Sequence, residues 1–378
     1  MKSVMIIAGE ASGDQHASLL VDAVHKKNSN IKFFGIGGEK MRAVGVETLV
    51  DAADMAVVGL IEVLAHRKVI FGALNLMRGL LTSRKPDLLI LVDYPEFNLR
   101  LAKAAKEAGI KVLFYISPQV WAWRQKRVHT IRERVDMMAV VFPFEADFYE
   151  QHNVPVRYVG HPLVDEVKAS KSRAELLKEF SLHNERPVIG IFPGSRKSEI
   201  KRLLPILLDS ARLILKQQPD VQFVMPLAST IDEPFLNLAD DPLFSYIKII
   251  PQRSYDVIEV CDAIMTVSGT VTLEIALLQK PMVVINKVAW LTYHIVRPML
   301  KIQHIGLCNI VADQRLVPEL IQQQARPELI AEEILRFIND RDYQQQTIDS
   351  LHVVRERLGN INATEQVAQL TLEMLNSD

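Results

Sequence analysis

The sequence has few of the residues that mark a disulfide-stabilised, metal-binding or membrane-spanning protein. Its 378 residues include two cysteines, Cys261 and Cys308. Two are too few for a disulfide framework or a cysteine-rich metal site, and suit a reducing compartment. No uncharged apolar run approaches the ~20 residues of a membrane span. The N-terminal MKSVMIIAGEASGD lacks the pattern of a signal peptide, and the formal net charge of -1 argues against bulk nucleic-acid binding. We therefore expect a cytoplasmic protein without a nucleic-acid partner.

Several catalytic and nucleotide-binding motifs are also missing. There is no Walker-type Gly-Lys-Ser/Thr loop, no HExxH and no CxxC, and GIGGEK at 35–40 lacks the third glycine of a dinucleotide fingerprint. Asp340-Arg-Asp342 has the form of the DxD metal motif of some sugar-nucleotide enzymes. Because it lies between two helical patterns, we predict that it caps a helix instead. We therefore expect neither a metal nor a cofactor.

Short apolar runs alternate with helical patterns along most of the chain. With 49% hydrophobic and 24% charged residues the chain can bury a large core, and its length predicts about two domains. Continuous aliphatic runs are typical of strands covered on both faces of a parallel sheet. The predicted strands are 3–8, 32–37, 88–92, 111–116, 136–141 and 156–159, then 188–192, 221–225, 246–250, 263–267 and 282–285. We therefore predict an α/β protein with two Rossmann-like, doubly wound domains, and helix from about Pro327 onward.

The predicted strand 88–92 runs directly into a carboxylate. In LVDYPEFN, Asp93 ends the apolar run, with Pro95 and Glu96 behind it. An ionised carboxylate in a poorly solvated cleft is costly unless it is paired or used. Asp93 is therefore either a turn residue or a base for a ligand bound above the strand end.

The stretch GEASGDQHA at 9–17 follows the first predicted strand. Its small residues permit close approach of a ligand or of another domain, and Glu10, Asp14 and His16 add polar groups. A tight turn with a helix cap explains the same residues equally well.

Two turns in the second half have the character of anion-binding sites. In IFPGSRKSEIKR, Gly194 and Ser195 expose backbone N–H groups at a helix start and Arg196 adds a fork of donors. In VSGTVTLE, the turn at 268–270 opens another helix, and Glu274 is placed to accept both hydroxyls of a ribose. Each turn alone also fits a capped helix with a solvated side chain. Because ligands of open α/β sheets bind beyond the carboxyl ends of the strands, the two together favour a diphosphate site.

Residues 117–134, SPQVWAWRQKRVHTIRER, combine Trp121 and Trp123 with many basic residues. Tryptophan is favoured where one side is apolar and the other wet, so the pair could lie exposed at a binding surface. The alternative is a pair packed in the core beside a solvated basic helix.

Residues 63–81 form a second apolar and basic segment, without an acidic residue. Such a helix either packs on a sheet or dips into an anionic membrane surface. Its apolar arc is predicted to comprise Ile70, Ala73, Leu74, Leu76, Met77, Leu80 and Leu81. The predicted membrane contacts are Val69, Phe71, Leu76, Arg67, Lys68 and Arg78.

Taken together, the chain resembles the lipid-A-disaccharide synthase family, inverting glycosyltransferases of the GT-B type. The resemblance extends from near residue 1 to past residue 310, and WAWRQKR together with PGSR and SGTVTLE is its most specific part. The matching segments are AGEASGD (8–14), VGLIEVL (58–64), VDYPEFN (92–98), SPQVWAWRQKR (117–127), FPFE (142–145), NVPVRYVGHPL (153–163), PGSR (193–196), SGTVTLE (268–274), KPMVV (280–284) and NI (309–310).

The resemblance implies transfer of 2,3-diacylglucosamine from UDP-2,3-diacylglucosamine to 2,3-diacylglucosamine 1-phosphate (lipid X), with release of UDP. It implies two domains that face a cleft: residues 1–165 for the acceptor and membrane, and residues 166–340 for the UDP-sugar. Residues 341–378 are expected to form a helical tail packing across them. Peripheral association with the anionic cytoplasmic face of the inner membrane is expected, and a homodimer is left open.

The resemblance also implies roles for individual residues. Asp93 is the expected base, because some members have Asp where this chain has Glu96, and Arg196 is expected to stabilise the leaving diphosphate. The UDP-sugar is expected on Gly194, Ser195, Arg196, Ser268, Gly269, Thr270, Glu274 and Asn309. The acceptor side is expected to comprise Glu10, Ser12, Gly13, Asp14, Glu96, Asn98, Trp121, Trp123 and Arg124. Rival interpretations are another GT-B enzyme, such as a UDP-N-acetylglucosamine 2-epimerase or a peptidoglycan-type N-acetylglucosaminyltransferase, and a non-catalytic UDP-sugar or lipid-binding module.

Overall fold

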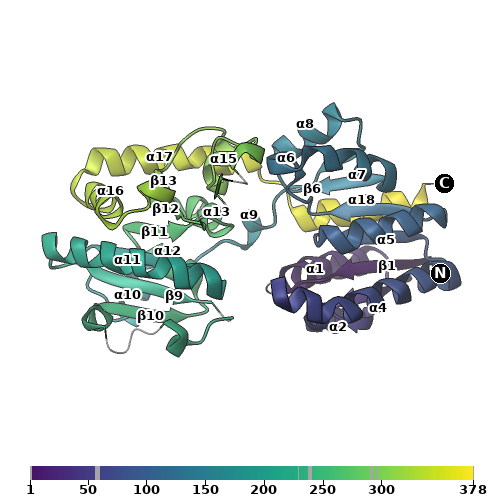
Figure 1. The fold of residues 1–378 in the computed structure, drawn as a ribbon, viewed down its shortest axis with the longest axis horizontal. Coiled ribbons are helices and arrows are strands. Elements are labelled where there is room, and N and C mark those ends of the chain that lie inside the picture. The colour runs from purple at the N-terminus through teal and green to yellow at the C-terminus, as the bar shows by residue number, and fades with distance from the viewer. Residues whose placement is uncertain are drawn as a thin grey trace. The chain divides into compact units, whose positions relative to one another are not determined.

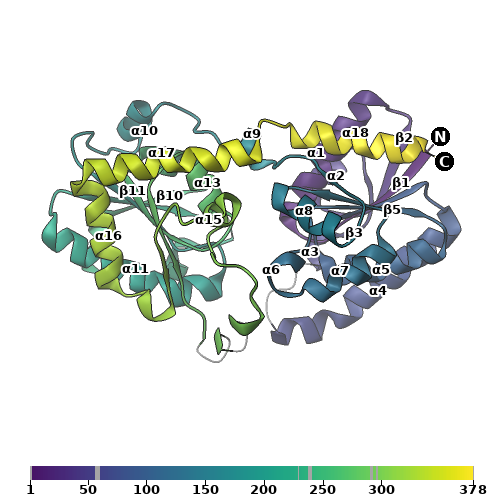
Figure 2. The ribbon, with the colours of Figure 1, turned by 90° about the horizontal axis from the view of Figure 1, so that it is seen from above.

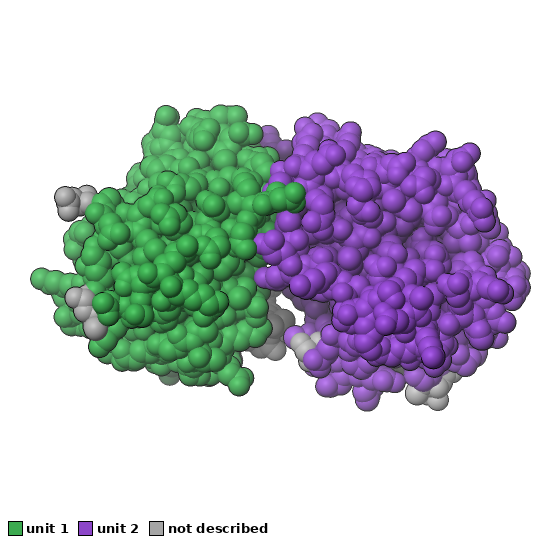
Figure 3. All heavy atoms as spheres, turned by 180° about the vertical axis from the view of Figure 1, so that it is seen from behind, with its two compact units in different colours: residues 1–162, 360–378 green, residues 163–359 purple. Residues whose placement is uncertain are grey.

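The chain forms two compact units, each built on a parallel sheet. The computed structural model describes residues 2–55, 60–228, 230–236, 241–289, 293–294 and 297–377, with the backbone alone for 60–67. Unit 1 comprises Met1–Pro162 and Asn360–Asp378, and unit 2 comprises Leu163–Gly359 (Figure 3). The division therefore falls near the expected 165/166 boundary, and the expected tail 341–378 is shared between the two units.

Unit 1 has a seven-stranded sheet in the order β3-β2-β1-β4-β5-β6-β7, with all neighbours parallel. Its strands β1 and β6 are labelled in Figure 1. The order reverses between β1 and β4, as in a doubly wound fold. The strands are β1 (Lys2–Ala8), β2 (Ile31–Gly37), β3 (Glu47–Asp51), β4 (Leu88–Val92), β5 (Lys111–Tyr115), β6 (Met137–Val140) and β7 (Val156–Tyr158). The sequence did not predict β3, an only partly buried edge strand with acids at both ends.

Helices cover both faces of this sheet (Figure 2). They are α1 (Ala11–Lys27), α2 (Glu39–Ala43), α3 (Ala52–Met55), α4 (Leu60–Arg84), α5 (Pro95–Glu107), α6 (Val120–Trp123), α7 (Val128–Arg134), α8 (Pro143–Gln151) and α18 (Ala363–Asn376), with the 3-10 turn η1 (Gln125–Arg127). The last helix, α18, packs along α1, and Lys27 and Glu365 join the two helices at 2.7 Å. The final segment of the chain thus completes the unit that the first segment begins.

Unit 2 has a six-stranded parallel sheet in the order β10-β9-β8-β11-β12-β13, which reverses between β8 and β11. The strands are β8 (Val188–Phe192), β9 (Gln222–Leu227), β10 (Ile247–Pro251), β11 (Ala263–Val267), β12 (Met282–Asn286) and β13 (Glu319–Ile321). Its α-helices include α9 (Leu163–Glu166), α10 (Arg173–Glu179), α11 (Lys197–Gln217), α12 (Ser254–Val260), α13 (Val271–Leu277), α15 (Leu307–Ala312), α16 (Pro327–Asn339) and α17 (Arg341–Leu358). Two Rossmann-like units are therefore confirmed, while the three-residue β13 was not predicted.

Asp340 has the structural role that its position predicted. It precedes α17, and its carboxylate accepts a hydrogen bond from the Tyr343 N–H at 3.0 Å. The DxD-like sequence is therefore a helix cap.

The apolar arc of α4 faces mainly the core of unit 1, as the first of the two alternatives for this helix predicted. Ala73, Leu74, Met77 and Leu81 are buried there, and Ile70 and Leu80 pack against the same cluster. Of the predicted arc, only Leu76 is largely exposed, at 46%. Among the described residues, no helix has both the length and the apolar character needed to cross a membrane.

Three apolar side chains of α4 are exposed as predicted, but they do not share one face. Val69 (42%) and Leu76 lie two turns apart on one side, whereas Phe71 (44%) lies roughly 160° from Val69 around the axis. There the Arg100 guanidinium of α5 is 5.9 Å from the Phe71 ring centroid. Lys68 and Arg78 are also exposed, whereas the Arg67 side chain and residues 58–59 of the VGLIEVL segment lie outside the described part. The exposed apolar stripe is therefore the Val69–Leu76 side of α4.

Candidate functional site

The predicted site residues follow the strands on either side of the two points where the strand order reverses. In unit 1, residues 9–14 follow β1 and Asp93 follows β4; in unit 2, residues 194–196 follow β8 and residues 268–270 follow β11. Ligands of open α/β sheets bind at these positions because the loops diverge there. Each unit therefore carries one candidate site at the carboxyl edge of its sheet.

The backbone at the end of β4 has an uncommon conformation that a buried amide stabilises. Asp93 and Tyr94 both have φ of 48°, in the left-handed region. The Asn98 side chain, which has no exposed surface, donates to the carbonyl oxygens of Val92 (3.3 Å) and Asp93 (2.5 Å). Asn98 therefore fixes the strand end from inside, and its predicted place on the acceptor surface is corrected. Backbone strain of this kind concentrates at functional sites.

The surroundings of Asp93 keep its carboxyl group poised near neutral pH. Burial raises the pKa of Asp93 to about 6, the negative charge of Glu10 adds to the rise, and the Tyr94 N–H opposes it. Tyr94 packs so closely on Gly9 that a Cβ there would lie 2.6 Å from its ring. Only glycine therefore fits at residue 9, and Glu10 follows it directly. A half-buried carboxylate of this pKa can take a proton from a hydroxyl at pH 7.

Asp14 has a structural role in place of the predicted ligand contact. Its Oδ1 accepts from the Gly38 N–H at 2.6 Å and its Oδ2 from the Lys40 N–H at 3.1 Å, at the start of α2. The side chain is buried, and it satisfies backbone donors that a short helix leaves unpaired. Gly13 is buried beside it, whereas Ser12 and Glu10 are exposed.

Trp121 is buried, so the two tryptophans do not form an exposed pair. Its indole Nε1 donates to Glu145 Oε1 at 3.0 Å, and Glu145 Oε2 accepts from the Phe142 N–H at 3.1 Å. Burial raises the pKa of Glu145 to about 7, although the hydrogen bonds from Trp121 and Phe142 lower it. The bond between Trp121 and Glu145 links the segment after β5 to the segment after β6, a contact 24 residues apart that periodicity could not reveal.

Trp123, by contrast, is exposed at 37% and carries the Arg124 guanidinium 4.1 Å from its ring centroid. Arg124 also lies 3.5 Å from Glu96 Oε1, and Arg127 pairs with that same oxygen. Glu96, at the start of α5, therefore joins the predicted acceptor residues to the basic segment.

In unit 2, the turn after β8 requires glycine at residue 194. Gly194 has φ of 99°, which favours glycine, and a Cβ there would lie 3.2 Å from Val267 of β11. The Ser195 carbonyl accepts from Thr230 Oγ1 at 2.9 Å, which tethers the turn. Arg196 precedes α11, is 73% exposed and contacts Glu199 at 3.0 Å, so most of its donors face solvent.

The turn after β11 lies against residues 305–307. Ser268 Oγ donates to the Ile305 carbonyl at 2.8 Å, and Thr272 Oγ1 accepts from the Leu307 N–H at 3.0 Å. Thr270 remains exposed at the start of α13. The Ser268 hydroxyl thus positions the turn, while Gly269 and Thr270 present its outer side.

Asn309 supports this region from inside and does not face a ligand. Its side-chain oxygen accepts from the Leu316 and Val317 N–H groups, and its amide donates to the Val317 carbonyl and to Glu319. It has no exposed surface. Because all its hydrogen-bonding groups are used within the protein, the expected direct contact with a sugar nucleotide is not met in this structure.

Glu274 borders a cavity of about 500 Å³ within unit 2. Burial raises the pKa of Glu274 to about 7, and the charge of Glu166 adds to the rise. The cavity is lined by Lys168, Ser170, Ala228, Gln252, Arg253, Ser254, Tyr255, Asp256 and Glu274. A cavity of this size and polarity can hold a nucleoside.

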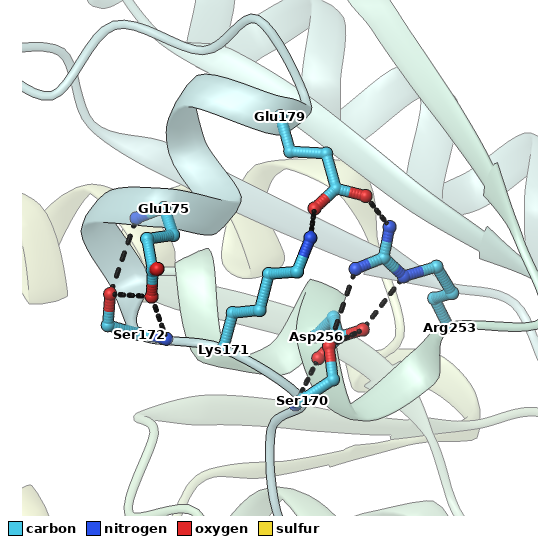
Figure 4. A network of polar contacts seen from close by, with 7 residues as sticks. All are labelled: Ser170, Lys171, Ser172, Glu175, Glu179, Arg253 and Asp256. Atoms are coloured by element: carbon cyan, nitrogen blue, oxygen red, sulfur yellow. Dashed lines mark hydrogen bonds and ion pairs between the residues drawn. The ribbon is translucent and has the colours of Figure 1, made fainter.

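An ion network fixes one wall of this cavity (Figure 4). Arg253 Nε pairs with Asp256 at 2.8 Å, and Asp256 accepts from the Ser170 N–H at 2.6 Å. Arg253 and Lys171 both pair with Glu179, and they hold the pKa of that carboxyl down at about 2. The segment after α9 and the start of α12 are thus held together.

Comparison with known proteins decides the family. The family model described as lipid-A-disaccharide synthetase matches residues 4–372. A lipid-A-disaccharide synthase of Geobacter metallireducens is 54% identical over 376 residues, covering 99% of this chain and 97% of that protein. One from Coxiella burnetii is 43% identical over 380 residues, covering 100% and 99%. The chain belongs to the lipid-A-disaccharide synthase family. It is a glycosyltransferase of lipid A biosynthesis.

Solved structures show the same fold at low sequence identity. A UDP-GlcNAc 2-epimerase from Neisseria meningitidis bound to UDP-GlcNAc has a TM-score of 0.65 at 16% identity, covering 99% of this chain and 100% of that chain. The calicheamicin glycosyltransferase CalG4 has a TM-score of 0.62 at 13% identity, covering 99% and 98%. The GT-B-like fold expected for a lipid-A-disaccharide synthase is therefore confirmed, and the likeness to epimerases is one of fold.

Sequence reasoning left out several groups that shape these sites. Glu145 lies in the quoted FPFE segment, but only its distant partner Trp121 reveals its role. Arg253 and Tyr255 could have been found, because IPQRSYD directly follows a predicted strand and so lies at the same sheet edge. In the described part of the chain, no three His, Cys, Asp or Glu side chains converge as a metal site.

The raised pKa of Asp93 predicts the acidic limb of the pH profile. If ionised Asp93 is the base, kcat/KM should fall about tenfold per pH unit below about pH 6 and level off above it. Glu10→Gln removes the neighbouring negative charge and should move this limb to lower pH. Steady-state rates between pH 4.5 and 8 measure the shift, with Glu107→Gln on the far end of α5 as control. If the acidic limb of the profile has the same midpoint in Glu10→Gln as in wild type, the charge of Glu10 does not raise the pKa of Asp93.

Proposed function

We propose that the chain transfers 2,3-diacylglucosamine from UDP-2,3-diacylglucosamine to lipid X, giving the β-1,6-linked disaccharide 1-phosphate and UDP. The observation that carries the proposal is the carboxylate of Asp93, with its pKa of about 6, in a chain that is 54% identical to a lipid-A-disaccharide synthase. Unit 2 holds the sugar nucleotide, and unit 1 supplies the base and the acceptor site.

In this mechanism the acceptor 6-hydroxyl gives its proton to Asp93 as its oxygen attacks the anomeric carbon. The bond from that carbon to the diphosphate oxygen breaks on the opposite face, so the configuration inverts and UDP leaves. Arg196 and the backbone N–H groups of the turns at 194–196 and 268–270 stabilise the negative charge that grows on the diphosphate. No metal ion is required.

Glu274 accepts hydrogen bonds from the ribose hydroxyls in this proposal, with the nucleoside in the cavity beside it. Support comes from the cavity's size and from its position at the carboxyl edge of the unit 2 sheet. The ionised carboxylate is the better acceptor, since it offers two oxygens and no competing proton.

The acyl chains of both substrates require an apolar environment, because exposure to water costs about 0.8 kcal/mol per CH₂. We propose that the Val69–Leu76 stripe of α4, with Lys68 on its edge, contacts the anionic cytoplasmic face of the inner membrane. Arg78 lies seven residues after Phe71, on the other flank of the helix. The association is peripheral and reversible. A homodimer stays a prediction, which light scattering of the purified protein tests.

Release of UDP tests the reaction and its base together. Wild-type protein mixed with both diacylated substrates should release UDP, and omission of either substrate should abolish the release. Asp93→Asn should lower the rate ~10²–10⁴-fold or more while UDP binding and the melting temperature stay near wild type. EDTA should leave the rate unchanged. UDP-N-acetylglucosamine conversion without lipid would favour an epimerase, and tight binding without turnover would favour a binding module.

Glu274→Gln should raise the KM for the sugar nucleotide more than it lowers kcat. In calorimetry, wild-type affinity for UDP should weaken as the pH falls from 8 to 6, by at most about tenfold per unit below pH 7, because protonation removes an acceptor. The variant should lose the part of this pH dependence that comes from Glu274, whereas the part that comes from the terminal phosphate of UDP, which itself titrates at about pH 6, should remain. Glu332→Gln, an exposed change on α16, is the control. An effect of Glu274→Gln on kcat alone would contradict the ribose role.

Val69→Ser with Leu76→Ser should reduce binding to anionic liposomes and lower activity on membrane-presented substrate more than activity in micelles. Phe71→Ser should have less effect, because Phe71 lies on the other flank of α4 beside Arg100. Co-sedimentation measures the binding. Met299→Ser, an exposed apolar position of unit 2, is the control. Unchanged sedimentation of the double variant would place the membrane contact elsewhere.

A further inference from the structure

A basic cluster formed by Arg124, Lys126 and Arg127 lies beside the start of α5. Arg124 is 3.5 Å from Glu96 Oε1, and Arg127 pairs with the same atom. Lys126 is exposed and forms no ion pair with any residue that the structure describes. Two guanidinium groups therefore share one carboxylate, and with Lys126 the cluster keeps an excess of positive charge.

The backbone of this cluster is held in place. The Arg127 N–H donates to the Arg124 carbonyl at 2.9 Å, and Gln125 Nε2 donates to the Trp121 carbonyl at 3.1 Å. Trp121 is itself buried and bonded to Glu145. Together with the stacking of Arg124 on Trp123, these contacts orient the two guanidinium groups toward one point before any ligand arrives.

The contribution of these ion pairs to folding stability does not explain why the two arginines converge on Glu96. Exposed ion pairs contribute little to folding because water and salt screen them. Each guanidinium has five N–H donors, and a single carboxylate oxygen uses only a small part of that capacity. The arrangement instead fits an anion with more oxygens and more charge than a carboxylate.

The cluster lies close to the proposed base. Glu96 is three residues after Asp93, so their Cα atoms are at most ~11 Å apart. A group bound at Glu96 is therefore about one sugar ring away from Asp93. In the acceptor, C1 bears the phosphate and C5 bears the carbon of the reacting 6-hydroxyl, and these two ring carbons flank the ring oxygen. One acceptor molecule can therefore contact the cluster and Asp93 at the same time.

We infer that Arg124 and Arg127 bind the phosphate monoester of the acceptor and that Glu96 occupies this position when the acceptor is absent. The inference rests on the proposed function. A phosphate monoester carries about -1.5 to -2 charges at pH 7 and three acceptor oxygens, so it engages both guanidinium forks better than Glu96 does. The cluster thereby orients the acceptor so that its 6-hydroxyl reaches Asp93.

The test compares two acceptors in nonionic micelles: 2,3-diacylglucosamine 1-phosphate and the same sugar without phosphate. Arg124→Ala/Arg127→Ala should raise the KM for the phosphorylated acceptor ~100-fold, since each lost charge-assisted contact costs at least about tenfold. The KM for the sugar nucleotide and the rate with the phosphate-free acceptor should change less than about threefold. In Arg124→Lys/Arg127→Lys, the KM for the phosphorylated acceptor should lie between the wild-type value and that of the alanine variant. The lysines keep the positive charge but lack the fork of N–H donors. Lys103→Ala, an exposed change on α5, is the control.

Binding of the two acceptors to the Asp93→Asn protein gives a second measurement that needs no turnover. The arginine changes added to that protein should abolish its preference for the phosphorylated acceptor. Equal losses with both acceptors would show a merely structural role and overturn the inference, as would unchanged affinity. A loss confined to binding of anionic vesicles would show that lipid headgroups, not the acceptor, occupy the cluster. A wild-type protein that releases no UDP would refute the proposed function, while the binding measurement would still decide on the cluster.

Discussion

The side-chain amide of Asn98 is the contact on which the acceptor half of the site depends. It holds the carbonyl groups of Val92 and Asp93 together, so that β4 ends in two left-handed residues. That conformation brings Tyr94 onto Gly9 and lets α5 begin at Pro95. The base next to Glu10 and the carboxylate among the arginines therefore both derive their positions from one buried side chain.

The two units have the same strand order at their reversal points but stabilise their loops differently. Unit 1 uses buried hydrogen bonds, which the amide of Asn98 donates to two carbonyl groups and the indole of Trp121 donates to Glu145. The cavity of unit 2 is fixed largely by charges, with Arg253 between Asp256 and Glu179 (Figure 4). Buried hydrogen bonds are insensitive to salt, whereas exposed ion pairs are screened by it. The pairs that Arg253 forms should therefore weaken with rising ionic strength more than the hydrogen bonds of Asn98 and Trp121 do.

The sequence predicted the regular parts of both units because buried parallel strands are continuous apolar runs. β4, β8 and β11 begin and end at the predicted residues. β3 and β13 were missed because an edge strand and a three-residue strand bury too little to leave such a run. Turn residues after strands were also found, since they follow from strand position. The roles of three buried side chains could not be predicted, because each depends on a partner elsewhere in the chain. Trp121 bonds to Glu145, Asp14 to the start of α2, and Asn309 to Glu319. On α4, apolar residues around most of the helix left the core-facing side ambiguous.

The return of α18 to α1 determines the order in which the protein can fold during synthesis. Unit 2 is one continuous segment, 163–359, whereas unit 1 needs residues 360–378 to complete it. A ribosome that adds residues from the N-terminus therefore releases all of unit 2 before α1 can receive its covering helix. Until then α1 lacks α18 and the ion pair between Lys27 and Glu365. Unit 1 begins the chain but is thus the last unit to be completed. The surface of α1 that α18 later covers is the one that a chaperone could bind during synthesis.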